Sequence, residues 1–350
     1  MGANEKNMSG TILRIQRMST EDGPGIRSTL FFKGCPLACV WCHNPESISP
    51  RLQIHWEKTR CIGCRSCIGA CVRGALAATE TGIAIDRSKC DSCDACVQAC
   101  PSTAMEMYGE ARGSNDLVRE VLKDEAYFRK SGGGVTLSGG EPTMQPLFAK
   151  ALLSTFKQAG IHTALDTCGQ CSWEILDALL PHTDLVLYDL KEINPDKHKK
   201  FTGVSNTRIL ENLILLKRFM KEDSVPGELW IRTPLIPDCT ATPENLQGIG
   251  KFIKEHLGPS VSRWELCTFN NLCIHKYEGL GIEWDFRKAA LLSRDEAGRL
   301  ACLAKESGVD PEIVHLSGPM REVSPDEFLE DRTRSGIARS GACSLGSDGG

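Results

Sequence analysis

Residues 28–47 read STLFFKGCPLACVWCHNPES, and this stretch decides how the rest of the chain is interpreted. Its first half is apolar and is typical of a buried strand. The strand leads into Cys35, Cys39 and Cys42, in the spacing C-x3-C-x2-C. Three thiolates leave one iron of a [4Fe-4S] cluster without a protein ligand, and a substrate-binding metal centre needs such an open position. The alternative is a zinc knuckle completed by His43 or His55.

Downstream of this loop, apolar strands alternate with amphipathic helices, which predicts a parallel sheet with crossover helices. Helices are expected at about 145–159, from about 172, at 207–221 and at 243–256. The strands are GVTLSGG (134–140), IHTALDT (161–167), DLVLYDLK (184–191), ELWIRTPL (228–235) and SRWELCTF (262–269). About six such units would form part of a barrel, whose site belongs at the carboxyl ends of the strands. The motifs GCPLAC, SGGEP, LDTCG, YDLK and LCTFN all stand at strand ends.

Two further cysteine groups, CIGCRSCIGAC (61–71) and CDSCDACVQACP (90–101), share the spacing C-x2-C-x2-C-x3-C. This is the bacterial ferredoxin pattern, in which the fourth cysteine of each group binds the other cluster. The first [4Fe-4S] cluster is therefore assigned to Cys61, Cys64, Cys67 and Cys100. The second is assigned to Cys90, Cys93, Cys96 and Cys71. Val72 stands where proline is usual. Zinc sites or disulfides are the alternative, and GALAAT and GIAIDR are expected to form small strands near the clusters.

Length and composition set the domain organisation. The chain has 350 residues and 18 cysteines, with a net charge of -4 and no basic field for nucleic acid. No apolar run is long enough to cross a membrane and the first 20 residues hold no export signal, so a cytoplasmic location is expected. We predict a barrel from 1–51 and 112–320, and an insert at 52–111. Residues 321–350 form an extension whose polar end, from about Arg332, is expected to be disordered.

In their order and spacing, these motifs resemble radical S-adenosylmethionine (SAM) enzymes, and more narrowly the activating enzymes of glycyl-radical enzymes. The resemblance covers about residues 10–320. It is carried by EDGPGIRSTLFFKGCPLACVWCHNPES (21–47), the insert, SGGGVTLSGGEP (131–142), DTCG and YDLK. It implies an α/β fold, a partial (β/α)6 radical SAM barrel with an inserted α+β ferredoxin-like domain holding two [4Fe-4S] clusters. The insert is typical of the branch that activates decarboxylases, dehydratases and hydrocarbon-adding succinate synthases.

The resemblance also implies which residues bind each group. Cys35, Cys39 and Cys42 would hold the cluster that chelates SAM. The remaining SAM contacts would be Trp41, His43, Gly139, Gly140, Glu141, Asp189, Leu190, Lys191, Arg232 and Asn270. A monovalent cation would lie among Asp166, Thr167 and Asp189, and Asp22 would meet the partner peptide. Asn270 stands where pyruvate formate-lyase activating enzyme has a histidine. Asparagine does not titrate near neutrality, so no proton transfer is assigned there.

The activity implied is one-electron chemistry with three [4Fe-4S] clusters, SAM and the monovalent cation. A flavodoxin or ferredoxin type donor would reduce the clusters, and one electron would break the bond between the SAM sulfur and its 5' carbon. Methionine would leave, and the 5'-deoxyadenosyl radical would take a hydrogen atom from a glycine of the partner enzyme. The alternatives are a radical SAM enzyme acting on a small molecule, and an electron carrier without SAM. The C-x-x-C pair Cys168 and Cys171 is interpreted as a strand end and helix start rather than a redox pair.

Overall fold

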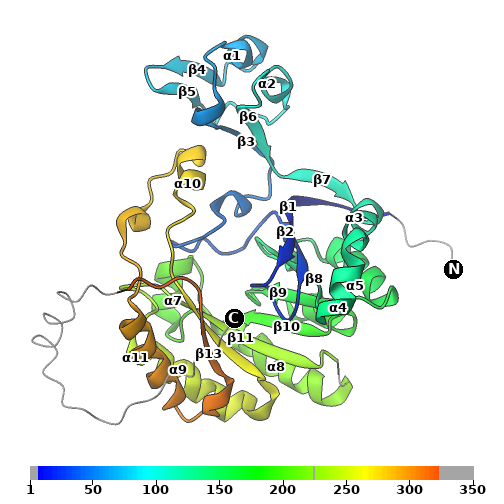
Figure 1. Cartoon of the computed structure of the whole chain (residues 1–350), viewed down its shortest axis with the longest axis vertical. Coiled ribbons are helices and arrows are strands. Elements are labelled where there is room, and N and C mark those ends of the chain that lie inside the picture. The colour runs from blue at the N-terminus through cyan, green and yellow to red at the C-terminus, as the bar shows by residue number, and fades with distance from the viewer. Residues whose placement is uncertain (1–6, 224, 323–350) are drawn as a thin grey trace, which may run out of the picture. The chain divides into compact units, whose positions relative to one another are not determined.

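The computed structural model describes residues 7–223 and 225–322, and the chain divides into two compact units (Figure 1). One unit contains the residues up to Leu185 together with Leu272–Trp284, and the other contains Val186–Asn271 with the residues from Asp285 onward. The polar end of the extension, expected to be disordered, lies outside the described residues, as does Cys343.

The sheet of the first unit has the strand order β9-β8-β2-β1-β7. Its strands are β1 (Ser9–Ser19), β2 (Arg27–Phe32), β7 (Glu110–Gly113), β8 (Gly134–Gly139) and β9 (His162–Thr167). β2, β8 and β9 pair in parallel, as predicted, and β1 is antiparallel to both β2 and β7. Every residue of β2 is buried, as expected for a parallel strand covered on both faces. β1 and β7 were not predicted, because β1 interleaves arginines with apolar residues and reads as a half-exposed segment.

Helices cover this sheet. They are α3 (Ser114–Val121), α4 (Glu125–Ser131), α5 (Pro146–Gln158) and α6 (Trp173–Leu179). Figure 1 shows α3, α4 and α5 beside β8 and β9, and α5 contacts both α3 and β9. α5 buries Phe148, Leu152 and Phe156, which recur every four residues and therefore share one helix face. The helices expected at 145–159 and from 172 are confirmed as α5 and α6.

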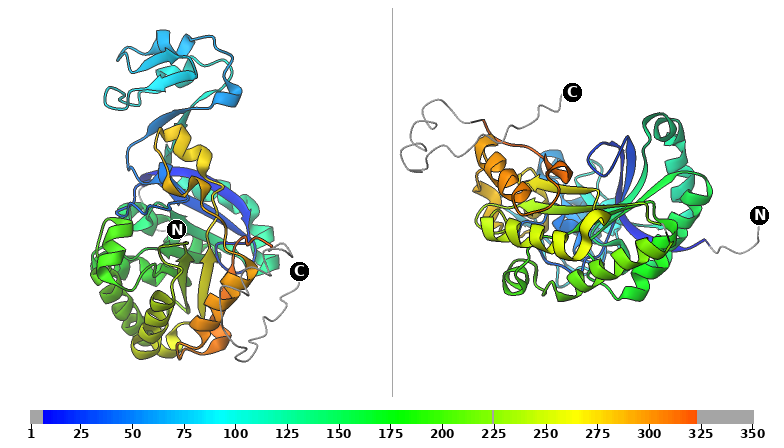
Figure 2. Two further views of the ribbon diagram at one scale, coloured as in Figure 1. Left: turned by 90° about the vertical axis from the view of Figure 1, so that its left-hand side faces the viewer. Right: turned by 90° about the horizontal axis from the view of Figure 1, so that it is seen from below.

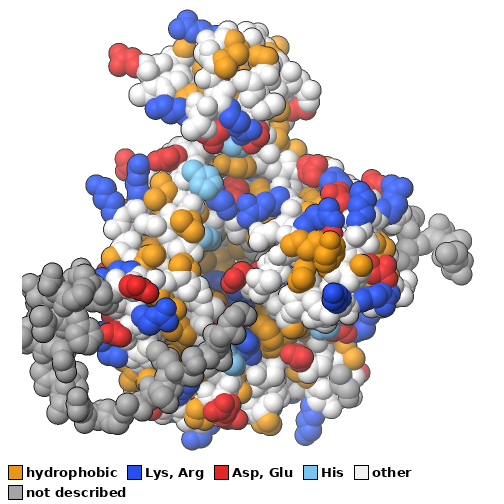
Figure 3. All heavy atoms as spheres, viewed as in Figure 1, with side chains coloured by type: hydrophobic (Ala, Val, Ile, Leu, Met, Phe, Trp, Pro, Cys, Tyr) orange, Lys and Arg blue, Asp and Glu red, His pale blue; other side chains and the backbone are white. Residues whose placement is uncertain are grey.

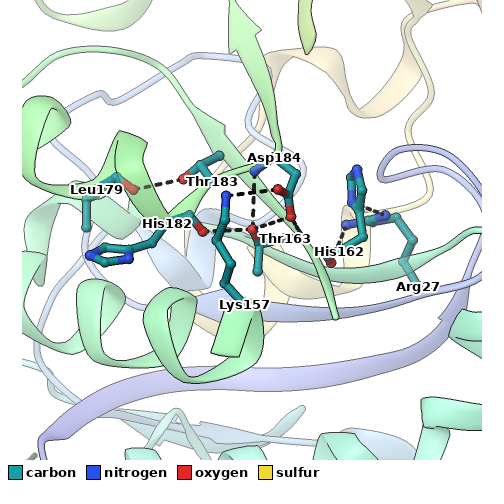
Figure 4. A network of polar contacts seen from close by, with 8 residues as sticks. All are labelled: Arg27, Lys157, His162, Thr163, Leu179, His182, Thr183 and Asp184. Carbon is teal, nitrogen blue, oxygen red and sulfur yellow. Dashed lines mark hydrogen bonds and ion pairs between the residues drawn. The ribbon is translucent and has the colours of Figure 1, made fainter. Parts of the chain in front are cut away.

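A polar network joins the starts of the parallel strands in the first unit (Figure 4). The buried Arg27 guanidinium donates to the Thr136 hydroxyl and the Val135 carbonyl, both at 2.7 Å. Burial lowers the pKa of Arg27 to about 10. The Asp184 carboxylate accepts from the Lys157 ammonium and from the Thr163 backbone, both at 2.9 Å. This network lies at the opposite end of β2 from the cysteine loop, so it supports the sheet rather than the site.

In the second unit the strand order is β13-β12-β11-β10, and β11, β12 and β13 pair in parallel. The strands are β10 (Leu185–Asp189), β11 (Glu228–Leu235), β12 (Arg263–Thr268) and β13 (Val314–Ser317). The helices are α7 (Pro195–Thr202), α8 (Thr207–Asp223), α9 (Pro243–Phe252) and α11 (Arg294–Lys305). α9 and α11 pack against each other (Figure 2). The helix expected to run to His256 ends at Phe252 and continues as a π-helical turn, Ile253–Leu257. β13 was not predicted.

The insert contains two antiparallel strand pairs and two short helices, seen at the top of the left panel of Figure 2. β3 (Gln53–Trp56) pairs with β6 (Met105–Tyr108), and β4 (Leu76–Thr79) pairs with β5 (Gly82–Ile85). The helices are α1 (Ser66–Ala70) and α2 (Ala95–Gln98). The small strands expected in GALAAT and GIAIDR are confirmed as β4 and β5. Glu110 and Ala111, the last two residues of the predicted insert, lie in β7 and pair with β1. They therefore belong to the larger sheet.

The two halves of the insert repeat the same local structure. Arg65 and Asp94 directly follow the second cysteine of their groups, and both adopt the left-handed conformation with φ of 61° and 62°. A short helix begins after each, and its cysteine, Cys67 or Cys96, is buried. The internal repeat seen in the cysteine spacing is therefore also present in the backbone.

Helix hydropathy and surface charge can be compared directly among the described residues. Within residues 7–223 and 225–322, none of the helices combines the length and hydropathy needed to cross a bilayer. On the described part of the face shown in Figure 3, acidic and basic side chains are interspersed. An extended basic field, the usual electrostatic footprint of a nucleic-acid site, is not visible there.

Candidate functional site

The cysteine loop begins directly after β2 and is closed by its own backbone. The Gly34 and Cys35 N–H groups donate to the carbonyls of Ser47 and Ile48, at 2.7 and 3.0 Å. The pKa of Cys42 is raised by burial, and the neighbouring thiols of Cys39 and Cys35 raise it further. The thiols of Cys35, Cys39 and Cys42, predicted to bind the cluster, are therefore close enough to interact. They lie at the carboxyl end of a parallel strand.

The glycine edge of β8 packs against the start of this loop. The N–H groups of Gly140 and Glu141 donate to the carbonyls of Phe32 and Gly34, at 2.9 and 2.8 Å. A Cβ atom added at Gly140 would lie 2.3 Å from the Gly34 carbonyl oxygen, and Gly139 has a φ of +110°. A side chain at either position would push the end of β8 away from the cysteine loop. The glycines are thus required for this packing, and their predicted contact with SAM stays a prediction.

Glu141 is completely buried and its carboxylate accepts hydrogen bonds from three residues. One oxygen accepts from the Thr143 N–H, the Thr143 hydroxyl and the Thr167 hydroxyl, at 3.1, 2.8 and 2.8 Å. The other oxygen accepts from the Cys168 N–H at 2.7 Å. The carboxylate therefore ties the end of β8 to the end of β9. It organises the strand ends that were predicted to bind SAM and a cation.

The end of β9 brings two further groups to this region. Asp166 accepts from the Ser138 hydroxyl at 2.6 Å, so this predicted cation ligand faces β8. The pKa of Cys168 is raised, first by a hydrogen bond with the Cys35 thiol and then by burial. The sequence interpretation of Cys168 as a strand end agrees with its position, but its contact with Cys35 was missed. The cysteines within the described ranges form no disulfides.

A short helix distant in sequence also contacts the cysteine loop. α10 (Ile274–Leu280) belongs to the first compact unit. The Tyr277 hydroxyl donates to the Cys42 carbonyl at 2.8 Å, and the Lys276 ammonium donates to the His43 carbonyl at 2.9 Å. These residues were missed because no local pattern links them to a loop more than 200 positions earlier in the chain.

Asp22 lies in the connection between β1 and β2. Its carboxylate accepts from the hydroxyls of Ser19 and Thr29, at 2.7 and 2.6 Å. The connection precedes β2, whereas the cysteine loop follows it, and a six-residue strand is about 20 Å long. The carboxylate stabilises this turn, and its predicted contact with a partner peptide stays a prediction.

Trp41, another predicted SAM contact, is buried in the cysteine loop of the first unit. The second unit holds the predicted contacts Asp189, Leu190, Lys191, Arg232 and Asn270. Lys191 forms an ion pair with Asp189 at 2.5 Å, and the Arg232 guanidinium lies 3.0 Å from a Glu265 oxygen. The buried Leu190 donates its N–H to the Arg232 carbonyl at 2.9 Å. Asn270 follows β12 and is half-buried. The basic side chains of Lys191 and Arg232 thus each have an acidic partner within their own unit.

In the insert, cysteines of both groups line one small pocket. Its cysteine lining is Cys71, Cys90, Cys93 and Cys96, the four residues assigned from the spacing. The pKa of Cys96 is raised to about 11 by burial, and the thiols of Cys90 and Cys71 add to the shift. Cys71 therefore lies with the cysteines of the other group, as the crosswise assignment requires.

Cys100 of the second cysteine group lies, in turn, close to the first group. The pKa of Cys67 is raised by burial, and the thiols of Cys100 and Cys64 raise it further. Across the described ranges, no group of three or more His, Cys, Asp or Glu side chains has the spacing of a single-ion site.

His55, the alternative zinc ligand, is placed elsewhere in the insert. Its ring stacks on Tyr108 with centroids 3.9 Å apart, and its Nε2 lies 3.2 Å from a Glu106 oxygen. Burial lowers the pKa of His55, although Glu106 opposes the shift. The ring is used in packing the β3–β6 pair.

This lowered pKa predicts a pH-dependent stability. An unfolded histidine has a pKa of about 6.5, so below that pH the unfolded chain takes up a proton that folded His55 resists. His55 therefore costs no stability above about pH 6.5 and destabilises the fold as the pH falls below it. We expect His55→Phe, which keeps the stacking, to lose less thermal stability than the wild type between pH 7.5 and 5.5. Unfolding midpoints measured without oxygen test this. His256→Gln, at an exposed position, is the control, and equal slopes for wild type and His55→Phe would contradict the assignment.

Comparison with known proteins places these observations in a family. The Radical SAM superfamily profile matches residues 29–241. The trans-4-hydroxy-L-proline dehydratase activating enzyme of Clostridioides difficile is 41% identical over 308 residues, which cover 87% of this chain and 99% of that protein. The (2S)-3-sulfopropanediol dehydratase activating enzyme of Klebsiella oxytoca is 36% identical over 301 residues, covering 85% and 93%. A solved domain of a pyruvate-formate lyase-activating enzyme from Bacteroides vulgatus covers 53% of this chain and 99% of its own, at 24% identity and a TM-score of 0.42. The chain therefore belongs to the radical SAM superfamily, among the activating enzymes of glycyl-radical enzymes.

Proposed function

We propose that this enzyme cleaves SAM reductively and generates the glycyl radical of a partner enzyme. The observation that carries the proposal is the convergence of Cys35, Cys39 and Cys42 at the carboxyl end of β2, against the glycine edge of β8. A [4Fe-4S] cluster with SAM would supply one-electron cleavage to methionine and a 5'-deoxyadenosyl radical, which takes a hydrogen atom from a glycine Cα. We further propose that β2 and the parallel strands β8 to β12 build a partial (β/α)6 barrel.

The chemistry of the cysteine loop fits a cluster. Burial raises the pKa of Cys42, so a thiolate there is unfavourable by itself. Cys42 would be held deprotonated as a ligand of iron, which would remove this penalty. The protein's part is to position the three sulfurs, to exclude water, and to keep the strand ends rigid through Glu141.

The insert supports a relay of two further [4Fe-4S] clusters, one held by Cys61, Cys64, Cys67 and Cys100 and the other by Cys90, Cys93, Cys96 and Cys71. The crosswise proximity of Cys100 and Cys71 to the opposite groups supports this arrangement. The exposed Cys64 and Cys93 bring both groups close to the surface. A flavodoxin or ferredoxin type donor would deliver electrons there.

The remaining contacts are proposed from the family. SAM would be bound by Trp41, His43, Gly139, Gly140, Glu141, Asp189, Leu190, Lys191, Arg232 and Asn270. A monovalent cation would be held by Asp166, Thr167 and Asp189, and Asp22 would contact the partner. The partner is proposed to be a dehydratase-type glycyl-radical enzyme, because two of the relatives above are dehydratase activating enzymes.

SAM cleavage by the reconstituted enzyme tests the function. The protein is loaded with iron and sulfide without oxygen and then mixed with dithionite and SAM. We expect methionine and 5'-deoxyadenosine in equal amounts and, with a partner dehydratase present, the electron paramagnetic resonance (EPR) doublet of a glycyl radical. If no SAM is cleaved by protein with about twelve irons, the proposed function is wrong.

A further inference from the structure

The helix α10 connects the cysteine loop with the insert. Residues 272–284 belong to the same compact unit as both, although their neighbours on either side along the chain belong to the other unit. α10 contacts η1 (Pro45–Ser47) in the cysteine loop and β3 in the insert. Because this segment contacts both the cysteine loop and the insert, it could position one relative to the other.

On the loop side, α10 and the segment after it hold three backbone carbonyls. Lys276 and Tyr277 donate to His43 and Cys42, as described above. The Trp284 indole donates to the Val40 carbonyl at 2.9 Å and stacks on Tyr277, with centroids 4.5 Å apart. The backbone carbonyls of Val40, Cys42 and His43 are therefore all held by side chains of residues 276–284.

One of these contacts leads directly to a cluster cysteine. The carbonyl of the His43–Asn44 peptide accepts from Lys276, while its N–H donates to the Cys42 sulfur. In a trans peptide the N–H and the carbonyl point to opposite sides, so fixing one fixes the other. Hydrogen bonds to cluster sulfurs raise the reduction potential. Lys276 is thus placed to influence the electronics of the cluster through one peptide unit.

Lys276 is itself held by a buried carboxylate. Its ammonium lies 3.0 Å from an oxygen of Glu46, which is 2% exposed, and it also donates to the Asn44 side chain at 2.6 Å. A buried ion pair adds little stability compared with an apolar pair of the same volume. Its use here is geometric, because the pair with Glu46 holds the ammonium where it also reaches the His43 carbonyl.

On the insert side, Arg87 holds the carboxyl end of α10. Its guanidinium donates to the carbonyls of Gly279 and Leu280, at 2.8 and 3.0 Å, and to the Ile54 carbonyl of β3 at 3.0 Å. The first two carbonyls end the helix, where a cation also interacts favourably with the helix dipole. Arg87 precedes Cys90 by three positions, so the same short segment carries a ligand of the second auxiliary cluster.

We propose that α10 is a latch that sets the separation between the SAM-binding cluster and the auxiliary clusters, with Lys276 and Arg87 as its positioning residues. The inference rests on the proposed electron relay. Electron transfer slows steeply with distance, so a helix bonded at one end to the cysteine loop and at the other to the insert controls the rate of delivery. Lys276 additionally sets the potential of the accepting cluster.

The Arg87 arm is tested by the rate of internal electron transfer. Wild type, Arg87→Ala, Arg87→Lys and Lys89→Ala are reconstituted and mixed with reduced flavodoxin, and reduction of the SAM-binding cluster is followed by freeze-quench EPR. We expect Arg87→Ala to be slower by about tenfold or more with unchanged iron content. Arg87→Lys should be intermediate, because one ammonium cannot span three carbonyls. Lys89 pairs with Asp86 at the surface, so Lys89→Ala should match the wild type.

The Lys276 arm is tested by the potential of the cluster. We expect Lys276→Met, combined with Glu46→Gln to avoid an unpaired buried charge, to shift the SAM-binding cluster to a lower potential in an EPR-monitored titration. Arg87→Ala should leave this potential unchanged. If wild type cleaves SAM but fully loaded Arg87→Ala transfers electrons at the wild-type rate, the latch is overturned while the proposed function stands. If wild type itself fails to cleave SAM, the proposed function is the part that fails.

Discussion

Cys39→Ala is expected to abolish SAM cleavage while leaving roughly eight irons per chain, those of the two auxiliary clusters. Cys39 is half-buried in the loop that starts at Gly34, and its removal leaves two thiols for a cluster that needs three. The backbone bonds that close the loop, from Gly34 and Cys35 to Ser47 and Ile48, do not involve this side chain. The variant should therefore fold and lose only one cluster.

The matched control is Cys93→Ala in the insert. Cys93 is exposed and lines the cavity of the second auxiliary group. We expect this variant also to lose about four irons. Unlike Cys39→Ala, it should keep the change in the EPR spectrum that SAM produces on its own cluster. Iron analysis, EPR and assays of 5'-deoxyadenosine separate the two variants. Undiminished cleavage by Cys39→Ala would show that the open cluster lies elsewhere.

Glu141→Ala is expected to destabilise the fold by about 3 kcal/mol or more. The carboxylate is fully buried and accepts from Thr143, Thr167 and Cys168. Its removal leaves buried hydroxyl and N–H groups without an acceptor, and each such group costs about 1–3 kcal/mol. Because these donors lie at the ends of β8 and β9, SAM cleavage should fall as well.

Anaerobic denaturant unfolding measures this effect, with two variants for comparison. Glu141→Gln keeps the shape but presents an amide to a donor, so it should lie between alanine and wild type. Glu125→Ala removes a surface carboxylate paired with Arg129 within one helix, and it should change stability little. A Glu141→Ala protein as stable as Glu125→Ala would show that the carboxylate does not hold the strand ends together.

Local pattern was enough to predict the repeating units of this fold. The strands β2, β8, β9, β10, β11 and β12 were all found from short apolar runs, because parallel strands are buried on both faces. Among the described residues, the strands β1, β3, β6, β7 and β13 were missed. β1 is half-exposed, β7 reads EARG and contains no apolar run, and β13 reads VHLS, in which polar residues interrupt the apolar ones.

The cysteine assignments show how far spacing alone reaches. The interval between Cys71 and Cys90 does not resemble a ligand pair, yet the ferredoxin pattern assigned the two residues to one group, and both line the same cavity. By contrast, nothing near Cys168 in the sequence indicates that its thiol contacts Cys35. Such a contact depends on β8 and β9 placing their ends next to β2.

The sequence by itself determined the family of this protein and its candidate metal ligands, because thiolate number and spacing restrict which metal centres a loop can bind. The tertiary structure alone decided what surrounds that centre. Glu141 joins two strand ends, and α10 returns from a distant part of the chain to hold the cysteine loop and the insert. The physical reason is that coordination depends on a few neighbouring residues, whereas buried hydrogen bonds between distant segments exist only after the sheet has formed.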